Sequence, residues 1–273
     1  MVFDGEVQRR SLAESGGKPP HGCAPGAAEP AEPGSARWWT ERVARRRRPR
    51  AGGLSTERIV EAALDVLRAG GVEALTVRAV AQRLHTSSPS LYRHIASRDE
   101  LITLIADHVL ADVRLVATGR GWRADAEGLM RELRRVLLAQ PLPPSAGRSR
   151  PGYGPNTLRL VDAALALFLD AGLTAGQAGR AAAVMIQFVA GVVDIERSAA
   201  GRGSRGATGA DGFDQLLSGL PADQFAALRA AGAAYVSVPS EEVFSYGMAR
   251  FLDGIASELS AAGGSGTSPP VDP

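Results

Sequence analysis

Cysteine and lysine are almost missing from this 273-residue chain, which holds one of each, Cys23 and Lys18. A single cysteine cannot form an internal disulfide, which fits a reducing compartment, so we expect a cytoplasmic protein. Cys23 also lies in a Pro-, Gly- and Ala-rich stretch that offers no rigid scaffold for a catalytic thiolate. The positive charge is therefore carried almost entirely by arginine, and the net charge of +2 says little about partners.

Long apolar runs, strand-like alternation and catalytic motifs are also scarce. No stretch approaches the length and composition expected of a transmembrane helix, and the N-terminus lacks a signal-peptide pattern, so we expect no membrane partner. The four histidines do not cluster with Cys23 or paired acids, which argues against a metal site. The stretch "GRGSRG" (201–206) fits G-x-G-x-x-G, but no strand precedes it, and a loop is the simpler interpretation. The sequence therefore predicts neither an enzyme nor a cofactor.

Both ends of the chain are predicted to be disordered, as a lead over residues 1–53 and a tail over 261–273. The lead ends in a basic run, Arg37 to Arg50, with seven arginines and one acid, Glu41. This run has three interpretations: a solvated linker, an arm on DNA phosphates or in a minor groove, or a membrane-surface segment next to Trp38 and Trp39. Its place just before a helical region favours the arm.

Helical periodicity begins after residue 54. Apolar spacing and capping residues predict helices over 55–69, 76–84 and 88–95, and a long fourth helix that opens with the Ser97–Glu100 capping box. The second and third helices are separated by about three residues, which is the spacing of a helix-turn-helix unit.

The third helix starts with small polar residues, "TSSPS", and then carries Tyr92, Arg93 and His94. Small residues at a helix start allow close approach to DNA, and free N–H groups there favour phosphate. Arginine suits guanine edges in the major groove. The alternative is structural: Tyr92 as a partly buried core residue, with Arg93 and His94 on a solvated face.

Residues 54–114 resemble the DNA-binding domain of the tetracycline-repressor (TetR) family. The resemblance rests on "ERIVEAALDVLRAGGVEALTVRAVAQRLHTSSPSLYRHIASRDELI". Within it, "LTVRAVAQRL", "PSLYRH" and "SRDEL" match the family's second, third and fourth helices in order and spacing. It implies contacts with an operator, a double-stranded DNA site, from Thr76, Arg78, Ser88, Pro89, Ser90, Tyr92, Arg93, His94 and Arg98. Two departures stand out: Arg93 replaces the tryptophan of the tetracycline repressors, and His85 replaces the usual glycine of the turn. Histidine tolerates a left-handed conformation better than most residues, so the turn is still expected.

The C-terminal part, residues 120–260, is predicted to be helical over 123–139, 157–171, 174–199, 222–232 and 240–260. Helices 174–199 and 240–260 carry wide apolar surfaces, which core packing alone could explain. The resemblance implies that they form a homodimer, and that a small-molecule effector binds inside this domain. Candidate pocket residues are Trp122, Met130, Leu133, Tyr153, Met185 and Phe188, each of which also suits a core.

The sequence thus predicts an all-α protein with an N-terminal helix-turn-helix domain and a C-terminal helical domain for ligand binding and dimerisation. The resemblance implies a transcriptional regulator, as a repressor that a small-molecule effector releases from its operator. The alternative is a helical small-molecule carrier or enzyme whose basic arm binds nucleic acid or membrane without sequence preference. Binding that depends on salt but not on sequence would indicate the alternative.

Overall fold

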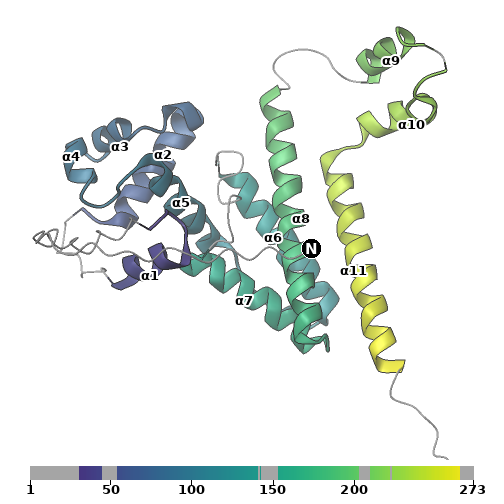
Figure 1. The fold of residues 1–273 in the computed structure, drawn as a ribbon, viewed down its shortest axis with the longest axis horizontal. Helices are drawn as coiled ribbons and strands as arrows, with labels where there is room; N and C mark the ends of the chain where they lie inside the picture. Colours follow the sequence, from purple (N-terminus) through teal and green to yellow (C-terminus); the bar gives the residue numbers. More distant parts are fainter. Residues whose placement is uncertain are drawn as a thin grey trace, which may run out of the picture. The chain divides into compact units, whose positions relative to one another are not determined.

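A computed structural model describes residues 31–44, 54–140, 142, 153–202, 210–221 and 223–264. Within these ranges every regular element is a helix, which confirms the predicted all-α class (Figure 1). The elements are α1 (Ala36–Ala44), α2 (Thr56–Ala74), α3 (Val77–Arg83), α4 (Ser88–Leu91), α5 (Arg98–Val109), the 3₁₀ turn η1 (Leu110–Asp112), α6 (Trp122–Ala139), α7 (Pro155–Asp170), α8 (Ala175–Arg202), α9 (Ala210–Ser218), α10 (Ala226–Ser237) and α11 (Ser240–Gly264).

Helix α1 corrects the prediction of a disordered lead. Its apolar surface comes from two tryptophans: Trp38 is buried, and its ring meets that of Trp39 edge to face at 4.7 Å between centroids. The guanidinium of Arg42 lies over the Trp38 ring at 5.2 Å. The apolar surface that these large rings bury offsets the conformational entropy lost when a short helix forms. A count of apolar residues in the lead does not reveal this stabilisation. The rest of the predicted lead, residues 1–30 and 45–53, lies outside the described residues.

The first helix of the DNA-binding region, α2, follows its predicted boundaries closely. The Ser55 hydroxyl accepts a hydrogen bond from the Arg58 N–H at 3.3 Å and caps the helix start. The predicted stop is visible as an interruption, because Gly71 has φ 70° and leaves helical geometry before a last short turn to Ala74. Ile59 and Leu67, almost fully buried, fix the helix to its neighbours.

Helices α4 and α5 are both shorter than predicted. The helical ladder of α4 ends at Leu91, and the next residues form turns in which the Ile95 N–H still bonds to the Leu91 carbonyl at 3.0 Å. The predicted capping box of α5 is present, since the Ser97 hydroxyl accepts from the Glu100 N–H at 3.0 Å. After Val109 the chain tightens into η1 and then becomes extended at Val113, so α5 does not continue to residue 117.

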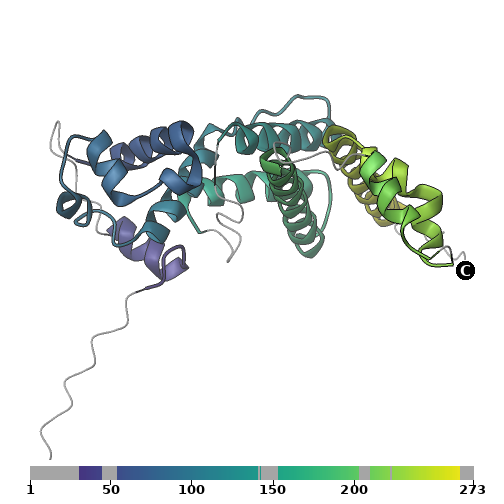
Figure 2. The same cartoon turned by 90° about the horizontal axis from the view of Figure 1, so that it is seen from above.

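Helices α6, α7 and α8 pack against one another, and α11 packs on α8 and α6 (Figures 1 and 2). Their core consists of Met130, Phe168, Met185 and Phe244, which are fully buried. The N-terminal helices α2 to α5, in blue in both views, form a second packed group joined to this one through α5 and α7.

Helix α8 corrects the expectation that no segment has the length of a membrane span. Residues 175–199 reach a mean hydropathy of 1.5 over an 18-residue window, enough by length and composition to cross a membrane. Core helices of soluble proteins have the same properties, and the contacts of α8 with α6, α7 and α11 place it in a helical core.

The C-terminal boundaries differ from the prediction in three places. The Gly-rich composition of "GRGSRGATGADG" (201–212) predicts a loop, but this range contains the end of α8 and the start of α9, with residues 203–209 outside the described part of the chain. The helix predicted over 222–232 is α10, which runs to Ser237. Helix α11 extends to Gly264, so the tail predicted to be disordered from residue 261 begins as helix, and its remainder lies outside the described residues.

Candidate DNA-binding site and ligand cavity

The helix-turn-helix consists of α3, a turn over the four residues 84–87, and α4. Thr76 caps α3, its hydroxyl accepting from the Ala79 N–H at 3.1 Å. His85 occupies the turn with φ 52°, the left-handed conformation that glycine usually supplies. The Thr86 N–H bonds to the Ala81 carbonyl at 3.0 Å and holds the turn closed. The predicted tolerance of histidine at this position is confirmed.

The outer face of α4 is polar and open to solvent. Leu91 and Ile95 are almost fully buried and anchor the segment from below. Tyr92 is 54% exposed, so it is a surface side chain rather than the partly buried core residue of the alternative interpretation. Pro89 and Arg93 are also exposed, while Ser88, Ser90 and His94 are half-buried.

Three polar side chains on this face are bonded to one another. The Arg93 guanidinium donates to the Ser90 hydroxyl at 3.1 Å, and the hydroxyls of Ser87 and Ser90 lie 2.9 Å apart. These bonds hold Arg93 along the helix start. Arg93 keeps further N–H donors for a phosphate or a base edge.

The remaining predicted DNA contacts lie on neighbouring elements. Thr76 and Arg78 are exposed at the start of α3. Arg98, at the start of α5, is exposed but donates to the carbonyls of Leu75 at 2.9 Å and Val72 at 3.2 Å. Arg98 therefore caps the end of α2. A DNA phosphate would have to bind the same guanidinium that already donates to these two carbonyls.

The contact between α1 and the helix-turn-helix region could not be predicted from sequence. The Arg42 guanidinium donates to the Glu100 carboxylate, to the Thr56 hydroxyl at 3.0 Å and to the His94 carbonyl at 3.3 Å. The same Glu100 carboxylate accepts from the Ala96 N–H at 2.6 Å. Arg42 thus ties α1 to the starts of α2 and α5 and to the end of the recognition segment. Since these residues are far apart in sequence, no local pattern predicts the contact.

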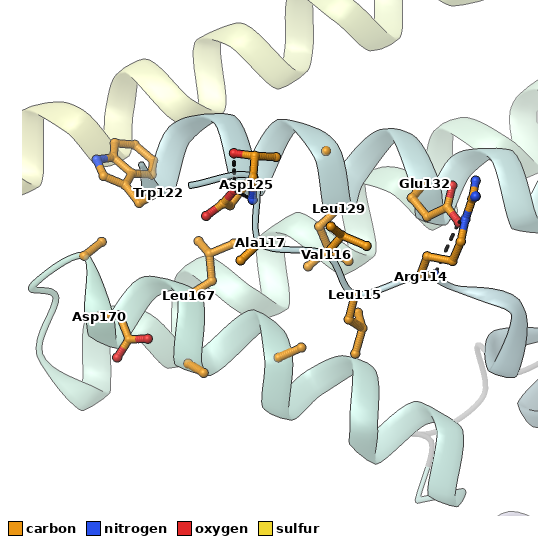
Figure 3. A pocket seen from close by; sticks show the side chains of 15 residues that line it. Arg114, Leu115, Val116, Ala117, Trp122, Asp125, Leu129, Glu132, Leu167 and Asp170 are labelled. Atoms are coloured by element: carbon orange, nitrogen blue, oxygen red, sulfur yellow. Dashed lines mark hydrogen bonds and ion pairs between the residues drawn. The ribbon is translucent and has the colours of Figure 1, made fainter. Parts of the chain in front are cut away.

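A cavity of about 750 Å³ lies between α6, α7 and the extended segment 114–118 (Figure 3). Small residues on both helices leave the space, among them Gly128, Ala163 and Ala166. Larger apolar side chains line its middle: Leu115, Val116, Leu129 and Leu167. Its volume and mixed lining are those of a small-molecule site.

Ionised groups sit at both ends of this cavity. The Glu132 carboxylate is held by Arg114 at 2.9 Å and Arg135 at 2.7 Å, and these bonds place its pKa far below the usual range. Asp125 accepts from the hydroxyl and the N–H of Thr118, and these bonds lower its pKa too. Within the described residues, no group of three or more His, Cys, Asp or Glu side chains is arranged to hold a metal ion.

Most of the predicted pocket residues pack in the helical core and do not line this cavity. Only Trp122 lines the cavity. Met130, Leu133 and Met185 are fully buried, Phe188 stacks on Phe244 at 5.9 Å, and Tyr153 is exposed just before α7. Large apolar side chains fill the bundle and leave no space, so the cavity forms where small side chains face each other. A clustering of Gly and Ala at helical spacing in 128–171 was the available signal.

A buried aspartate joins the DNA-binding region to the C-terminal helices. Asp107 of α5 is 6% exposed, and its carboxylate caps α7. It accepts from the Asn156 side-chain amide at 3.1 Å and from both the N–H and the hydroxyl of Thr157 at 2.9 Å. A Cβ on Gly154 would lie 2.1 Å from the Asp107 carboxylate, so only glycine lets α7 approach this closely. A negative charge at a helix start is also favoured by the helix dipole.

Arg159 forms the second half of this junction. Its guanidinium, on α7, donates to the carbonyls of Leu110 at 2.9 Å, Ala111 at 3.2 Å and Val113 at 3.0 Å. It therefore holds η1, which connects α5 to the cavity segment 114–118. Asp107 and Arg159 could not be singled out from sequence, because each bonds to partners about fifty positions away.

Helices α8 and α11 pack on each other, and each exposes large apolar side chains. Val184 and Ile195 of α8 are 50% and 69% exposed, and Val243 and Tyr246 of α11 are 47% and 68% exposed. Exposed apolar groups gathered in this way mark an interaction surface. We call these four residues the apolar face.

Two family models and several known proteins match this chain. A model described as bacterial regulatory proteins of the tetR family matches residues 59–105, and one described as the tetracyclin repressor-like C-terminal domain matches 116–259. An HTH-type transcriptional regulator of Saccharopolyspora erythraea is 37% identical over 144 residues, covering 52% of this chain but only 61% of that protein. The class A tetracycline repressor from transposon 1721 in Escherichia coli is 31% identical over 208 residues, covering 74% of this chain and 91% of that protein.

Solved structures agree with these matches. The TetR family protein ActR of Streptomyces coelicolor in complex with actinorhodin superposes with a TM-score of 0.68. It is 31% identical and covers 76% of this chain and 99% of that one. The helix-turn-helix geometry and these matches lead to one conclusion: the chain belongs to the tetR family of bacterial transcriptional regulators, with a tetracycline-repressor-like C-terminal domain.

Proposed function

We propose that this regulator is a homodimeric repressor that reads a palindromic operator through α3 and α4 of each subunit. The exposed face of α4 carries the proposal: Tyr92, Arg93 and Pro89 are open to solvent, while Leu91 and Ile95 fix the segment to the core. The proposed DNA contacts are Thr76, Arg78, Ser88, Pro89, Ser90, Tyr92, Arg93, His94 and Arg98. Of these, Arg98 contributes least, since its guanidinium already binds two carbonyls.

Dimerisation follows from how a helix-turn-helix reads DNA. One unit reads a half-site, and a two-fold symmetric pair reads a palindrome with half-sites about one turn apart. The apolar face of α8 and α11 supplies a surface that a second copy would cover. Its apolar side chains would otherwise remain in water, at a cost of about 25 cal/mol per Å².

Release of the operator would start from the cavity between α6 and α7. The similar protein ActR is seen in complex with actinorhodin, which supports a ligand-bound form of the C-terminal domain here. The cavity segment 114–118 continues directly from η1, and α7 both lines the cavity and receives the Asp107 cap. A ligand that moves either element would change the angle between α5 and α7. The coupling free energy between ligand binding and operator binding is typically about 1–3 kcal/mol in such proteins.

The proposal includes a cytoplasmic location and no catalytic activity. A regulator of this kind acts where the DNA is, and the single cysteine, Cys23, suits a reducing compartment. The Glu132 carboxylate is held by Arg114 and the Asp125 carboxylate by Thr118, as expected for a binding site.

The direct test is selection of operators from random duplex DNA by the purified protein at moderate salt, with the dimer mass measured in parallel. We expect a dimer and an enriched palindrome with half-sites about one turn apart. Binding without any enriched sequence, and lost as salt rises, would reject the proposal and indicate nonspecific contact by basic residues.

Residue-level contacts are then tested on the selected operator. Tyr92→Ala and His94→Ala are expected to weaken binding about tenfold each, as loss of one phosphate contact worth about 1.4 kcal/mol would do. The matched control is Tyr235→Ala, because Tyr235 on α10 is 76% exposed and far along the chain from the helix-turn-helix. If Tyr92→Ala and His94→Ala bind as tightly as the control, the assigned contact surface is wrong.

A further inference from the structure

The two ends of the cavity differ in charge (Figure 3). At the Glu132 end, Arg114 and Arg135 both bind the carboxylate, so its charge is fully compensated. The other end carries Trp122, Asp125 and Asp170. Among the described lining residues Arg114 is the only cation, and it lies at the Glu132 end.

The carboxylates at the Trp122 end are not neutralised in the same way. Asp125 is held by the neutral donors of Thr118, and these bonds keep it ionised by lowering its pKa. Arg120 lies near enough to contribute to this lowering, but it does not line the cavity. Asp170 has no ion-pair partner among the described residues. The Asp170 carboxylate is therefore an uncompensated negative charge at the same end of the cavity as the Trp122 indole.

An indole face and carboxylates together favour a cation. The ring face of tryptophan attracts ammonium and other organic cations, and the attraction is strongest where water is partly excluded. The middle of the cavity is apolar, and Val116 there is 71% exposed, so an apolar ligand body would cover side chains that now face water. A volume of about 750 Å³ suits a drug-sized molecule.

We propose that this cavity binds an aromatic organic cation. Its charged group lies at the end formed by Trp122, Asp125 and Asp170, and its ring system lies against the apolar middle. Anionic ligands of the same shape are disfavoured, because they would bring a second negative charge next to Asp170. This inference rests on the proposed function, since it names the ligand class of the cavity from which release would start.

Two xanthene dyes of similar size and opposite charge test the ligand class. Rhodamine 123 is a cation and fluorescein is an anion, and fluorescence anisotropy gives the affinity of each for the full chain without DNA. We expect rhodamine 123 to bind about tenfold more tightly than fluorescein, the difference that cation–π and carboxylate contacts provide. Equal binding of the two dyes, or tighter binding of fluorescein, overturns the proposal.

A matched pair of variants tests the site. Asp170→Asn is expected to weaken rhodamine 123 binding roughly threefold to tenfold, as loss of a partly exposed ion pair does. Asp162→Asn makes the same charge change at an exposed position of α7 that does not line the cavity, and it should leave the affinity unchanged. Equal effects of the two variants would mean that the dye responds to overall charge, which overturns the proposal.

Tryptophan emission locates the bound dye. The chain has three tryptophans, Trp38, Trp39 and Trp122, and only Trp122 lines the cavity. Rhodamine 123 should quench the emission, and Trp122→Phe should abolish most of that quenching. Unchanged quenching in Trp122→Phe would place the dye elsewhere and overturn the site.

A smaller pair of probes covers the case in which neither dye enters. 2-Naphthylmethylammonium should raise the melting temperature of the protein more than 2-naphthoate does. If neither probe of this pair gives a shift, the cavity does not take organic cations and the proposal is rejected. Operator selection is independent of all these measurements, so failure of the ligand class and failure of the proposed function are distinguishable.

Discussion

The polar face of α4 and the apolar face of α8 and α11 are both exposed, but they respond to water in opposite ways. Tyr92 and Arg93 on α4 offer hydrogen-bond donors that water satisfies until DNA replaces it. Ile195 and Val243 on the apolar face offer nothing to water, and their exposure is unfavourable until another apolar surface covers them. In the proposed function, the apolar face would govern assembly, and the polar face would govern which DNA the assembly prefers.

The two faces also differ in how they are supported. The segment around α4 rests on two buried anchors, Leu91 and Ile95, and on a left-handed turn at His85. The apolar face rests on two helices of more than twenty residues each, α8 and α11, fixed by a stack of Phe188 on Phe244 and by Arg134. Arg134 binds Glu196 at 3.0 Å and lies over the Phe244 ring at 4.8 Å. A change on the apolar face should alter assembly with little effect on the fold, whereas a change at the turn should alter local geometry.

The largest expected effect comes from a charge on the apolar face. Ile195→Glu places two like charges across a two-fold interface, so the protein should become monomeric. Specific operator binding should fall about 100-fold or more, because each subunit then binds one half-site alone. Sedimentation gives the mass and a gel-shift titration gives the affinity.

The control for this variant is Leu158→Glu, which changes an apolar residue of α7 that is 51% exposed and lies outside the apolar face. It should leave both mass and operator affinity unchanged. A dimeric Ile195→Glu with normal affinity would move the interface to another surface.

The junction between the two regions gives the next effect. Gly154→Ala should lower the free energy of unfolding by about 2–3 kcal/mol, because its Cβ meets the buried Asp107 carboxylate at 2.1 Å and forces the cap apart. Operator affinity should fall as well, since α5 loses its fixed angle to α7. Urea unfolding and the gel-shift titration measure the two changes.

Gly179→Ala is the matched control, because a Cβ there meets nothing within 4 Å. Alanine favours a helix interior over glycine, so this variant should be as stable as the parent or slightly more so. If Gly154→Ala behaves like it, the junction is not closely packed.

The turn of the helix-turn-helix gives a smaller effect on the polar face. His85→Val should cost about 1–2 kcal/mol of stability, because a β-branched residue strongly resists the left-handed conformation at φ 52°. His85→Gly fits this conformation and should keep both stability and operator binding close to those of the parent. Equal stability of the two variants in urea would contradict a left-handed turn.

The helix-turn-helix could be predicted from sequence because its signals are local. Thr76 and Ser97 cap helices within three residues of their partners, and Leu91 and Ile95 share a face through helical periodicity. The boundaries of α4 and α5 were less predictable, since a helical pattern continues past the point where the backbone tightens into turns.

The cavity and the junction could not be predicted in the same way. The Asp107 cap joins residues about fifty positions apart, and Arg42 reaches Glu100 across fifty-eight. Bulky residues that were expected to line a pocket, such as Met130 and Met185, pack in the core and do not line the cavity. Space is left by small residues, and the sequence does not show which small residues face one another.

The smallest expected effect is the pH dependence of Glu132, at the compensated end of the cavity. Hydrogen bonds from Arg135 and Arg114 lower its pKa in the folded state, so folding favours the ionised form. The ionised Glu132 therefore contributes to the free energy of unfolding, and this contribution is complete above the ordinary glutamate pKa of 4.5. It is lost progressively as the pH falls below 4.5, because the unfolded chain takes up a proton there before the folded protein does. Glu132→Gln should therefore cost less than about 1 kcal/mol at pH 7, as for other largely exposed pairs. The stability difference between Glu132→Gln and the parent should shrink between pH 4.5 and 3. The control is Glu127→Gln, because Glu127 has one looser ion-pair partner, Arg123 at 3.5 Å, and this variant should differ less in stability from the parent at pH 7. Melting curves of the three proteins across this range measure the change, and a gap that widens as pH falls would contradict the lowered pKa.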